Sequence, residues 1–162
     1  MSSILPPAAE RHFEDYPVGA IFDLGSFVLS EDDMVDFATR YDPQSMHVDR
    51  DWAAQGPFGG LIASGWHTVA ALMRLIVENF LPHNGLASPG VNELRWLAPL
   101  RPGDDLMLDV EIVEARVSRS RPSTGIVTVK CVIRNAAGQV LCEMISPIIV
   151  ERLPARALGQ AG

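Results

Sequence analysis

A stretch of helical periodicity between residues 66 and 81 leaves this chain few ways to fold. Its apolar side chains cover most of a helical wheel, and only His67, Arg74 and Glu78 interrupt them, near one stripe. A helix that is apolar almost all round is stable only when other elements cover it. The sequence therefore predicts a long helix over 66–81 that is buried on most of its sides.

The chain that follows this helix has the period of strands. Residues 106–112 alternate between apolar side chains and Met107, Asp109 and Glu111, as in a half-buried strand. The short turns RPGD, RPSTG and NAAG separate segments rich in valine, isoleucine and leucine, and strands joined in this way pair antiparallel. The predicted strands cover 91–98, 105–119, 125–135 and 139–151.

A single apolar helix needs one large curved surface to cover it, and the predicted sheet supplies that surface. The expected fold class is α+β, an antiparallel sheet wrapped around a long central helix. Before it, residues 21–29 predict a strand, and Ser30 caps a helix that Pro43 ends. Asp42 then lies on the loop after that helix, which continues through a short turn at Trp52 and Ala53.

With 162 residues the chain is long enough for one domain, predicted over 13–153, with flexible ends at 1–12 and 154–162. A formal charge of −7 opposes binding to nucleic acid and to anionic lipid. No apolar run approaches the roughly 20 residues that cross a bilayer. The first residues lack the basic and apolar pattern of a secretion signal, so the expected location is the cytoplasm.

The two cysteines, Cys131 and Cys142, are too few for a disulfide framework and have no neighbours at metal-ligand spacing. Both are expected to be reduced core thiols. If NAAG forms a hairpin turn, the two residues fall nearly opposite each other across it.

Chemistry-bearing side chains gather between residues 41 and 49. Asp42, Gln44, Ser45 and His47 place a carboxylate, an amide, a hydroxyl and an imidazole in a segment expected to be irregular. A carboxylate and an imidazole that converge on one water can polarise it and return a proton to a neighbouring carbon. The alternative is structural: Asp42 caps local amides, and His47 bonds to a nearby carbonyl.

A second candidate is the glycine-rich segment 58–65 that leads into the long helix. Glycine at a helix entrance lets a ligand oxygen reach unpaired backbone N–H groups, and the helix dipole favours negative charge there. Gly65 is therefore a candidate oxyanion donor, although such glycines also serve tight turns and close packing. His67 follows in the first helical turn, where a lone polar residue is more often structural.

Arg116, Arg119 and Arg121 gather near one predicted strand end in an otherwise acidic protein. A guanidinium matches phosphate oxygens in a bidentate way, so Arg116 and Arg119 are candidates for binding a phosphate-bearing substrate. The alternative is that they are the solvated end of a strand.

At these residues the chain resembles the MaoC-like dehydratases and (R)-specific enoyl-CoA hydratases, whose motif reads roughly G-D-x-N-P-x-H-x-D. Asp42, His47 and Asp49 match that motif in identity and spacing. Residues 62–65, IASG, resemble the I-A/V-H-G segment of the family, and FEDYPVG and LAPLRPGD are also similar. The likeness covers about residues 13–151.

The resemblance implies a hot-dog fold, a homodimer or higher homo-oligomer, and acyl-CoA substrates bound at the dimer interface, as in fatty acid metabolism. It implies no metal or redox cofactor. Asp42 and His47 would hold one water that adds across the 2,3 double bond, and the Gly65 N–H would bind the thioester carbonyl. Gln44 and Ser64 would lie beside this dyad and contact the substrate. Trp66 and Phe58 would shape the acyl site, although both are also simple core candidates.

The chain departs from the motif at four positions: Tyr41 replaces Gly, Gln44 replaces Asn, Ser45 replaces Pro, and Ser64 stands where the family often has His. Gln44 can still donate a hydrogen bond and orient the dyad. Two alternatives to a hydratase stay open. One is a hot-dog acyl-CoA thioesterase, in which water attacks the carbonyl carbon, and the other is a non-catalytic acyl-CoA binding module.

Overall fold

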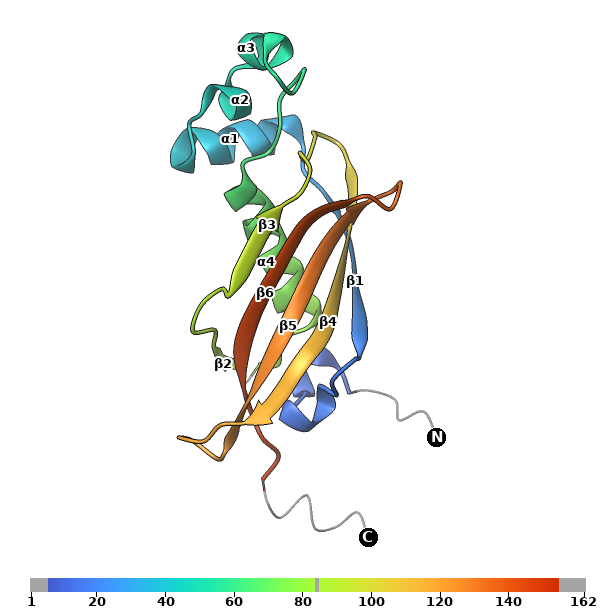
Figure 1. Cartoon of the computed structure of the whole chain (residues 1–162), viewed down its shortest axis with the longest axis vertical. Helices are drawn as coiled ribbons and strands as arrows, with labels where there is room; N and C mark the ends of the chain where they lie inside the picture. Colours follow the sequence, from blue (N-terminus) through green and yellow to red (C-terminus); the bar gives the residue numbers. More distant parts are fainter. Residues whose placement is uncertain (1–5, 84, 155–162) are drawn as a thin grey trace.

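The computed structural model describes residues 6–83 and 85–154, which form a long antiparallel sheet with one long helix beside it (Figure 1). Two 3₁₀ helices, η1 and η2, precede the first strand. The elements in chain order are η1 (Ala8–Glu10), η2 (Phe13–Asp15), β1 (Ile21–Val28), α1 (Glu31–Tyr41), α2 (Ser45–Val48), α3 (Arg50–Gln55), α4 (Gly65–Asn79), β2 (Gly85–Ala87), β3 (Glu93–Trp96), β4 (Asp105–Val117), β5 (Thr124–Asn135) and β6 (Val140–Glu151).

The strands pair in the order β1, β4, β5, β6, and both β2 and β3 pair with the remaining edge of β6. Every pairing is antiparallel, as the short turns predicted. The predicted segments agree with β3 to β6, although 91–98 shortens to Glu93–Trp96 and 105–119 ends at Val117. The three-residue strand β2 was not predicted, because it is too short to show a period.

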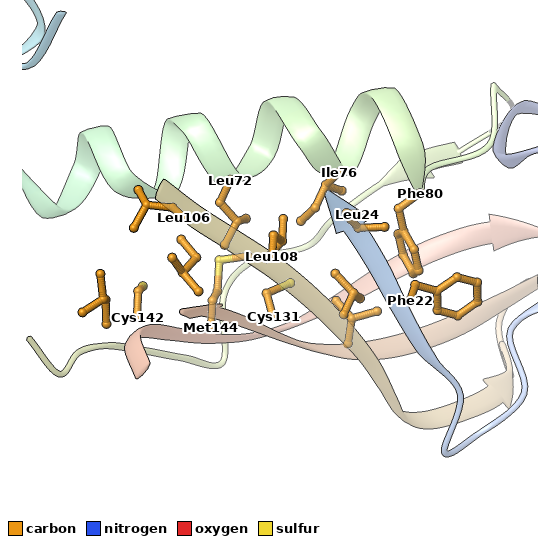
Figure 2. Packing of buried hydrophobic residues seen from close by; sticks show 14 of the residues in the cluster. Phe22, Leu24, Leu72, Ile76, Phe80, Leu106, Leu108, Cys131, Cys142 and Met144 are labelled. Atoms are coloured by element: carbon orange, nitrogen blue, oxygen red, sulfur yellow. The ribbon is translucent and has the colours of Figure 1, made fainter. Parts of the chain in front are cut away.

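The apolar positions of β4 alternate as expected and form the centre of the core. Helix α4 contributes one buried stripe to it, made of Thr68, Leu72 and Ile76. Figure 2 shows Leu72 and Ile76 directed from the helix toward side chains of the sheet. The inward residues of β4 between 106 and 112 are all fully buried: Leu106, Leu108, Val110 and Ile112.

The prediction that the long helix is buried on most sides is wrong for the single chain. Trp66, Met73 and Val77 form a second apolar stripe on α4, and they are exposed by 59%, 41% and 58%. Within the chain the sheet covers one stripe of the helix, and the second stripe faces outward. The third face carries His67, Arg74 and Glu78, and Arg74 forms an ion pair with Glu78 as their i, i+4 spacing favours.

Helix α1 begins and ends where the sequence predicted. The Ser30 side chain accepts a hydrogen bond from the Asp33 amide, and Asp42 is the C-terminal capping residue. The segment after it was expected to be irregular with one turn, but it contains the short helices α2 and α3. Asp49 ends α2 and caps α3 through a hydrogen bond from the Trp52 amide, so His47 lies on a helical turn.

Cys131 and Cys142 are buried free thiols on neighbouring strands. Cys131 pairs with Met144 and Cys142 with Ile133, so the two cysteines are diagonal neighbours on one face of the sheet. Burial raises the pKa of Cys131 to about 12 and that of Cys142 to about 11. Both therefore stay protonated thiols at neutral pH.

Part of the N-terminal segment expected to be flexible contacts the domain. The His83 amide donates to the Ala9 carbonyl, and the Arg11 guanidinium lies over the Phe22 ring. Residues 1–5 and 155–162, which belong to the ends predicted as flexible, lie outside the described residues. In the described ranges, no helix is both long enough and apolar enough to cross a bilayer.

Candidate active site

Asp42 is held at the point where α1 ends. Its backbone N–H still donates to the Ala38 carbonyl at 2.8 Å, but its own backbone has left the helical conformation. Pro43 follows, and a proline disfavours helical geometry in the residue before it. Local sequence therefore places Asp42 at the end of the helix, as predicted.

Two neutral donors hold the Asp42 carboxylate. Gln44 donates from Nε2 to Oδ1 at 2.7 Å, and Ser64 donates from Oγ to Oδ2 at 2.7 Å. These hydrogen bonds, from Gln44 first and Ser64 second, lower the pKa of Asp42 below its ordinary value, while partial burial opposes them. The nearby His47 adds a smaller lowering. Asp42 is thus a carboxylate at neutral pH, and Gln44 still orients it despite replacing Asn of the motif.

His47 is buried, with 4% of its surface exposed, and its ring is fixed by a backbone contact. Nδ1 lies 2.8 Å from the Ile62 carbonyl oxygen, and a carbonyl only accepts, so Nδ1 carries a proton. In the neutral ring Nε2 then has a free lone pair. Nε2 lies 3.5 Å from Asp42 Oδ2, so two acceptors face a common point. A water molecule that donates one proton to each satisfies both.

The N-terminus of α4 borders the same point. Ser64 is the capping residue, and its Oγ accepts from the Trp66 amide at 3.3 Å while donating to Asp42. The Gly65 N–H donates no hydrogen bond to any residue that the structure describes. An unpaired amide at a helix N-terminus is a suitable donor to an oxyanion.

The structure also gives a packing reason for Gly65. A Cβ at this position would overlap the indole ring of Trp96, whose Nε1 donates to the Gly65 carbonyl at 3.1 Å. Trp96 in turn meets Trp66 edge to face, with ring centroids 5.5 Å apart. Close packing, one of the two predicted roles of this glycine, therefore applies. The Gly65 amide nevertheless has no hydrogen-bond acceptor among the described residues, and Gly65 lines the cavity.

Asp42, Gln44, His47 and Gly65 line one cavity of about 440 Å³. Phe58 and Trp66, predicted to shape the site, also line it, and Ser64 lies behind Asp42. Most of its remaining wall is apolar and comes from three regions of the chain, α2, the segment after α3, and the β3 end with the chain that follows it. The lining residues from these three regions are Met46, Ile62, Ala63, Trp96, Leu97, Ala98, Pro99 and Leu100. Thr68 of α4 and Leu141 of β6 complete the wall.

Arg116 and Arg119 are not brought to this cavity within the chain. Strand β4 runs from the end of the molecule near α1 to the opposite end, and Arg116 is its penultimate residue (Figure 1). Arg116 forms an ion pair with Glu114 at 3.4 Å, and Arg119 lies in the following turn. The alternative reading, a solvated strand end, describes their position in this structure.

His67 lies on another face of α4, as expected for a structural residue. Its ring stacks on Phe37 with centroids 4.5 Å apart and an interplanar angle of 4°. Burial lowers its pKa, and the charge of Asp33 opposes this shift. It lines a separate groove with residues of α1 and β1, away from the Asp42 cavity.

The largest feature that the sequence did not indicate is the wall of residues 96–100. Trp96 contacts Gly65 across 31 positions of sequence, and Leu100 accepts the Ala63 amide at 2.9 Å. The turn LAPLRPGD was noted only for its resemblance. No local pattern identifies which residue of an edge strand packs on a helix N-terminus, so this wall needed the structure.

Comparison with known proteins identifies the family of the chain. The family model "MaoC like domain" matches residues 15–134. The 3-hydroxybutyryl-CoA dehydratase of Methylorubrum extorquens is 33% identical over 119 residues, which are 73% of this chain and 74% of that protein.

Two solved structures define the fold. A crystal structure of the MaoC-like dehydratase from Rhodospirillum rubrum has 38% identity and a TM-score of 0.83, and covers 89% of this chain and 99% of its own. A Mycobacterium tuberculosis protein, Rv0216, described as a double hot-dog fold, has 18% identity and a TM-score of 0.71 over 90% of this chain and 45% of its own. The α+β architecture is therefore the hot-dog fold, and the chain belongs to the family of proteins with a MaoC-like domain.

Proposed function

We propose that this protein is a hydratase or dehydratase that adds water to a 2-enoyl-CoA, or removes it, with Asp42 and His47 as its acid/base pair. The observation that carries the proposal is the distance of 3.5 Å between His47 Nε2 and Asp42 Oδ2 in a cavity that the Gly65 amide also borders. The kinship with a 3-hydroxybutyryl-CoA dehydratase supports the same chemistry.

The dyad divides the proton work between its two members. Asp42, whose pKa is lowered by its two hydrogen bonds, stays ionised and orients the water. His47 Nε2 takes a proton from that water while the water oxygen bonds to the β-carbon of the enoyl thioester. The Asp42 carboxylate offsets the positive charge of the imidazolium, which then returns the proton to the α-carbon. Dehydration follows the same steps in reverse.

The electrons of the double bond move onto the thioester oxygen during this addition, and the resulting negative charge needs a fixed donor. The free N–H of Gly65 is that donor, at the positive end of the α4 dipole. Removing one donor of this kind from an enzyme typically costs about 100-fold or more in turnover.

The apolar cavity wall, including Phe58, Trp66 and Leu97, supplies a surface for the acyl chain. Trp66 also belongs to the exposed apolar stripe of α4 with Met73 and Val77. Exposed patches of this kind mark interaction surfaces. We infer that a second copy of the chain covers this stripe in a homodimer and thereby borders the cavity.

Incubation of the purified protein with crotonyl-CoA tests the function. Hydration removes the enoyl absorbance without releasing a thiol. Release of free thiol at the same rate would instead indicate a thioesterase. Binding without either change would indicate a non-catalytic acyl-CoA binding module, and both outcomes would overturn the proposal.

A further inference from the structure

Arg101 contacts two segments that line the cavity. It follows directly after the lining residues 96–100, and its Nη2 donates to the Phe58 carbonyl at 2.6 Å. Phe58 also lines the cavity, in the segment that follows α3. The guanidinium therefore lies at the rim of the cavity and is fixed by a backbone contact.

This guanidinium has no carboxylate partner among the described residues. Most other arginines form ion pairs, such as Arg50 with Glu31 and Arg152 with Glu14. The nearest acidic residue in sequence, Asp104, uses Oδ2 to accept the Arg101 backbone amide at 3.0 Å instead. In a chain of net charge −7, Arg101 thus keeps an uncompensated positive charge beside the cavity.

The remaining side-chain donors of Arg101 form no hydrogen bond with the described residues, and two glycines lie next to it in the chain after Phe58. Gly59 and Gly60 have φ values of +64° and +151°, which favour glycine over residues with a side chain. A Cβ at Gly60 would come within 3.5 Å of Arg101 Nη1. A guanidinium has five N–H donors, and the contact with Phe58 uses one of them.

We propose that Arg101 binds a phosphate group of the thioester carrier as the acyl chain enters the cavity. A guanidinium binds phosphate oxygens in a bidentate, charge-assisted way. Coenzyme A and the phosphopantetheine arm of a carrier protein both present such a phosphate at a fixed distance from the thioester. The inference rests on the proposed function, and it assigns to Arg101 the role that the sequence suggested for Arg116 and Arg119.

The test compares wild type with Arg101→Gln on crotonyl-CoA, on crotonyl-4′-phosphopantetheine and on the phosphate-free crotonyl N-acetylcysteamine thioester. Gln can still donate to the Phe58 carbonyl but carries no charge. Loss of a charged hydrogen bond raises KM about tenfold or more for the phosphate-bearing substrates, with kcat little changed. The phosphate-free substrate shows equal kcat/KM with both proteins. Arg116→Gln is the matched control and leaves all three substrates unchanged.

The three substrates separate the possible sources of the phosphate. A defect on crotonyl-CoA that is absent on crotonyl-4′-phosphopantetheine places the contact on the nucleotide part of coenzyme A. A defect on both places it on the phosphate next to the pantetheine. An equal defect on all three substrates means that Arg101 only connects residues 96–100 to Phe58. That result would overturn the inference, as would no defect at all.

Calorimetric titration with coenzyme A, pantetheine and pantetheine 4′-phosphate keeps the inference testable if no substrate is turned over. Weaker binding of coenzyme A or of the phosphorylated pantetheine by Arg101→Gln, with pantetheine unaffected, supports Arg101 even where the proposed function fails. Equal affinities of the two proteins reject Arg101 whether or not the protein is a hydratase.

Discussion

The Ser64 hydroxyl donates to the Asp42 carboxylate at 2.7 Å and so joins the end of α1 to the beginning of α4. The same hydroxyl accepts from the Trp66 amide. Ser64 therefore both caps α4 and hydrogen-bonds to the carboxylate of the proposed acid/base dyad. The arrangement places the negative charge of Asp42 beside the positive end of the α4 dipole. Folding of the helix entrance and ionisation of Asp42 are therefore coupled.

Ser64→Ala and Gln44→Met should each raise the pKa of Asp42 toward its ordinary value. Each variant removes a hydrogen bond that favours the charged carboxyl, and the Gln44 bond is the larger contribution. Carbon-detected NMR titration of labelled aspartate measures the change. Ser45→Ala, next to the same loop but without a contact to Asp42, is the control, and an Asp42 titration unaltered in both test variants would contradict the coupling.

The same shift has a consequence for stability. Asp42 has a lower pKa folded than unfolded, so its charge stabilises the fold at pH values above the unfolded pKa and ceases to do so as pH falls through the folded value. The difference in unfolding free energy between wild type and Asp42→Asn should be present at neutral pH and shrink in acid. Urea unfolding of both proteins, at neutral pH and at a pH below the pKa of an ordinary aspartate, measures this difference.

The sequence predicted those parts of the site that local signals control. Ser30, the acidic first turn and Pro43 fix both ends of α1, so the position of Asp42 followed from neighbouring residues. The alternation over 106–112 likewise gave the buried face of β4, because a strand has a strict period of two.

Long-range contacts account for what the sequence did not predict. The carbonyl that fixes the His47 ring belongs to Ile62, 15 residues away, and the indole on Gly65 comes from β3. The burial of α4 was overestimated for a related reason. Periodicity shows that a face is apolar but does not show whether the same chain or another one covers it.

Gly65→Ala should destabilise the protein, because the added methyl group overlaps the Trp96 ring. Overpacking of this kind typically costs about 1–3 kcal/mol. In a Trp96→Ala background the same substitution should cost little, since the space is then free. Chemical unfolding of the four proteins in this cycle measures the coupling. A penalty that is the same in both backgrounds would show that Trp96 is not the reason for the glycine.

The exposed stripe of α4 predicts how the protein associates. Met73→Lys together with Val77→Lys should convert a dimer into a monomer, because two charges would have to be buried in the interface. Light scattering after size-exclusion chromatography measures the mass. Arg74→Ala, on the face of α4 that bears charges, is the matched control and should remain dimeric. A monomeric wild type at micromolar concentration would refute the homodimer.

Asp42→Asn and His47→Ala should each lower kcat by at least about 100-fold while the unfolding midpoint shows that the fold is retained. In the proposed mechanism both residues act on the same water, because Nε2 and Oδ2 lie 3.5 Å apart. Once one is removed, the other has no correctly placed water to act on. The double variant should therefore be only slightly less active than the less active of the two single variants. Its loss should be far smaller than the product of the two separate losses.

Asp36→Asn and His83→Ala change the same residue types outside the cavity and should keep full activity. Independent, multiplicative losses would mean that the two side chains serve different steps, and parental rates in both single variants would remove the dyad from the mechanism.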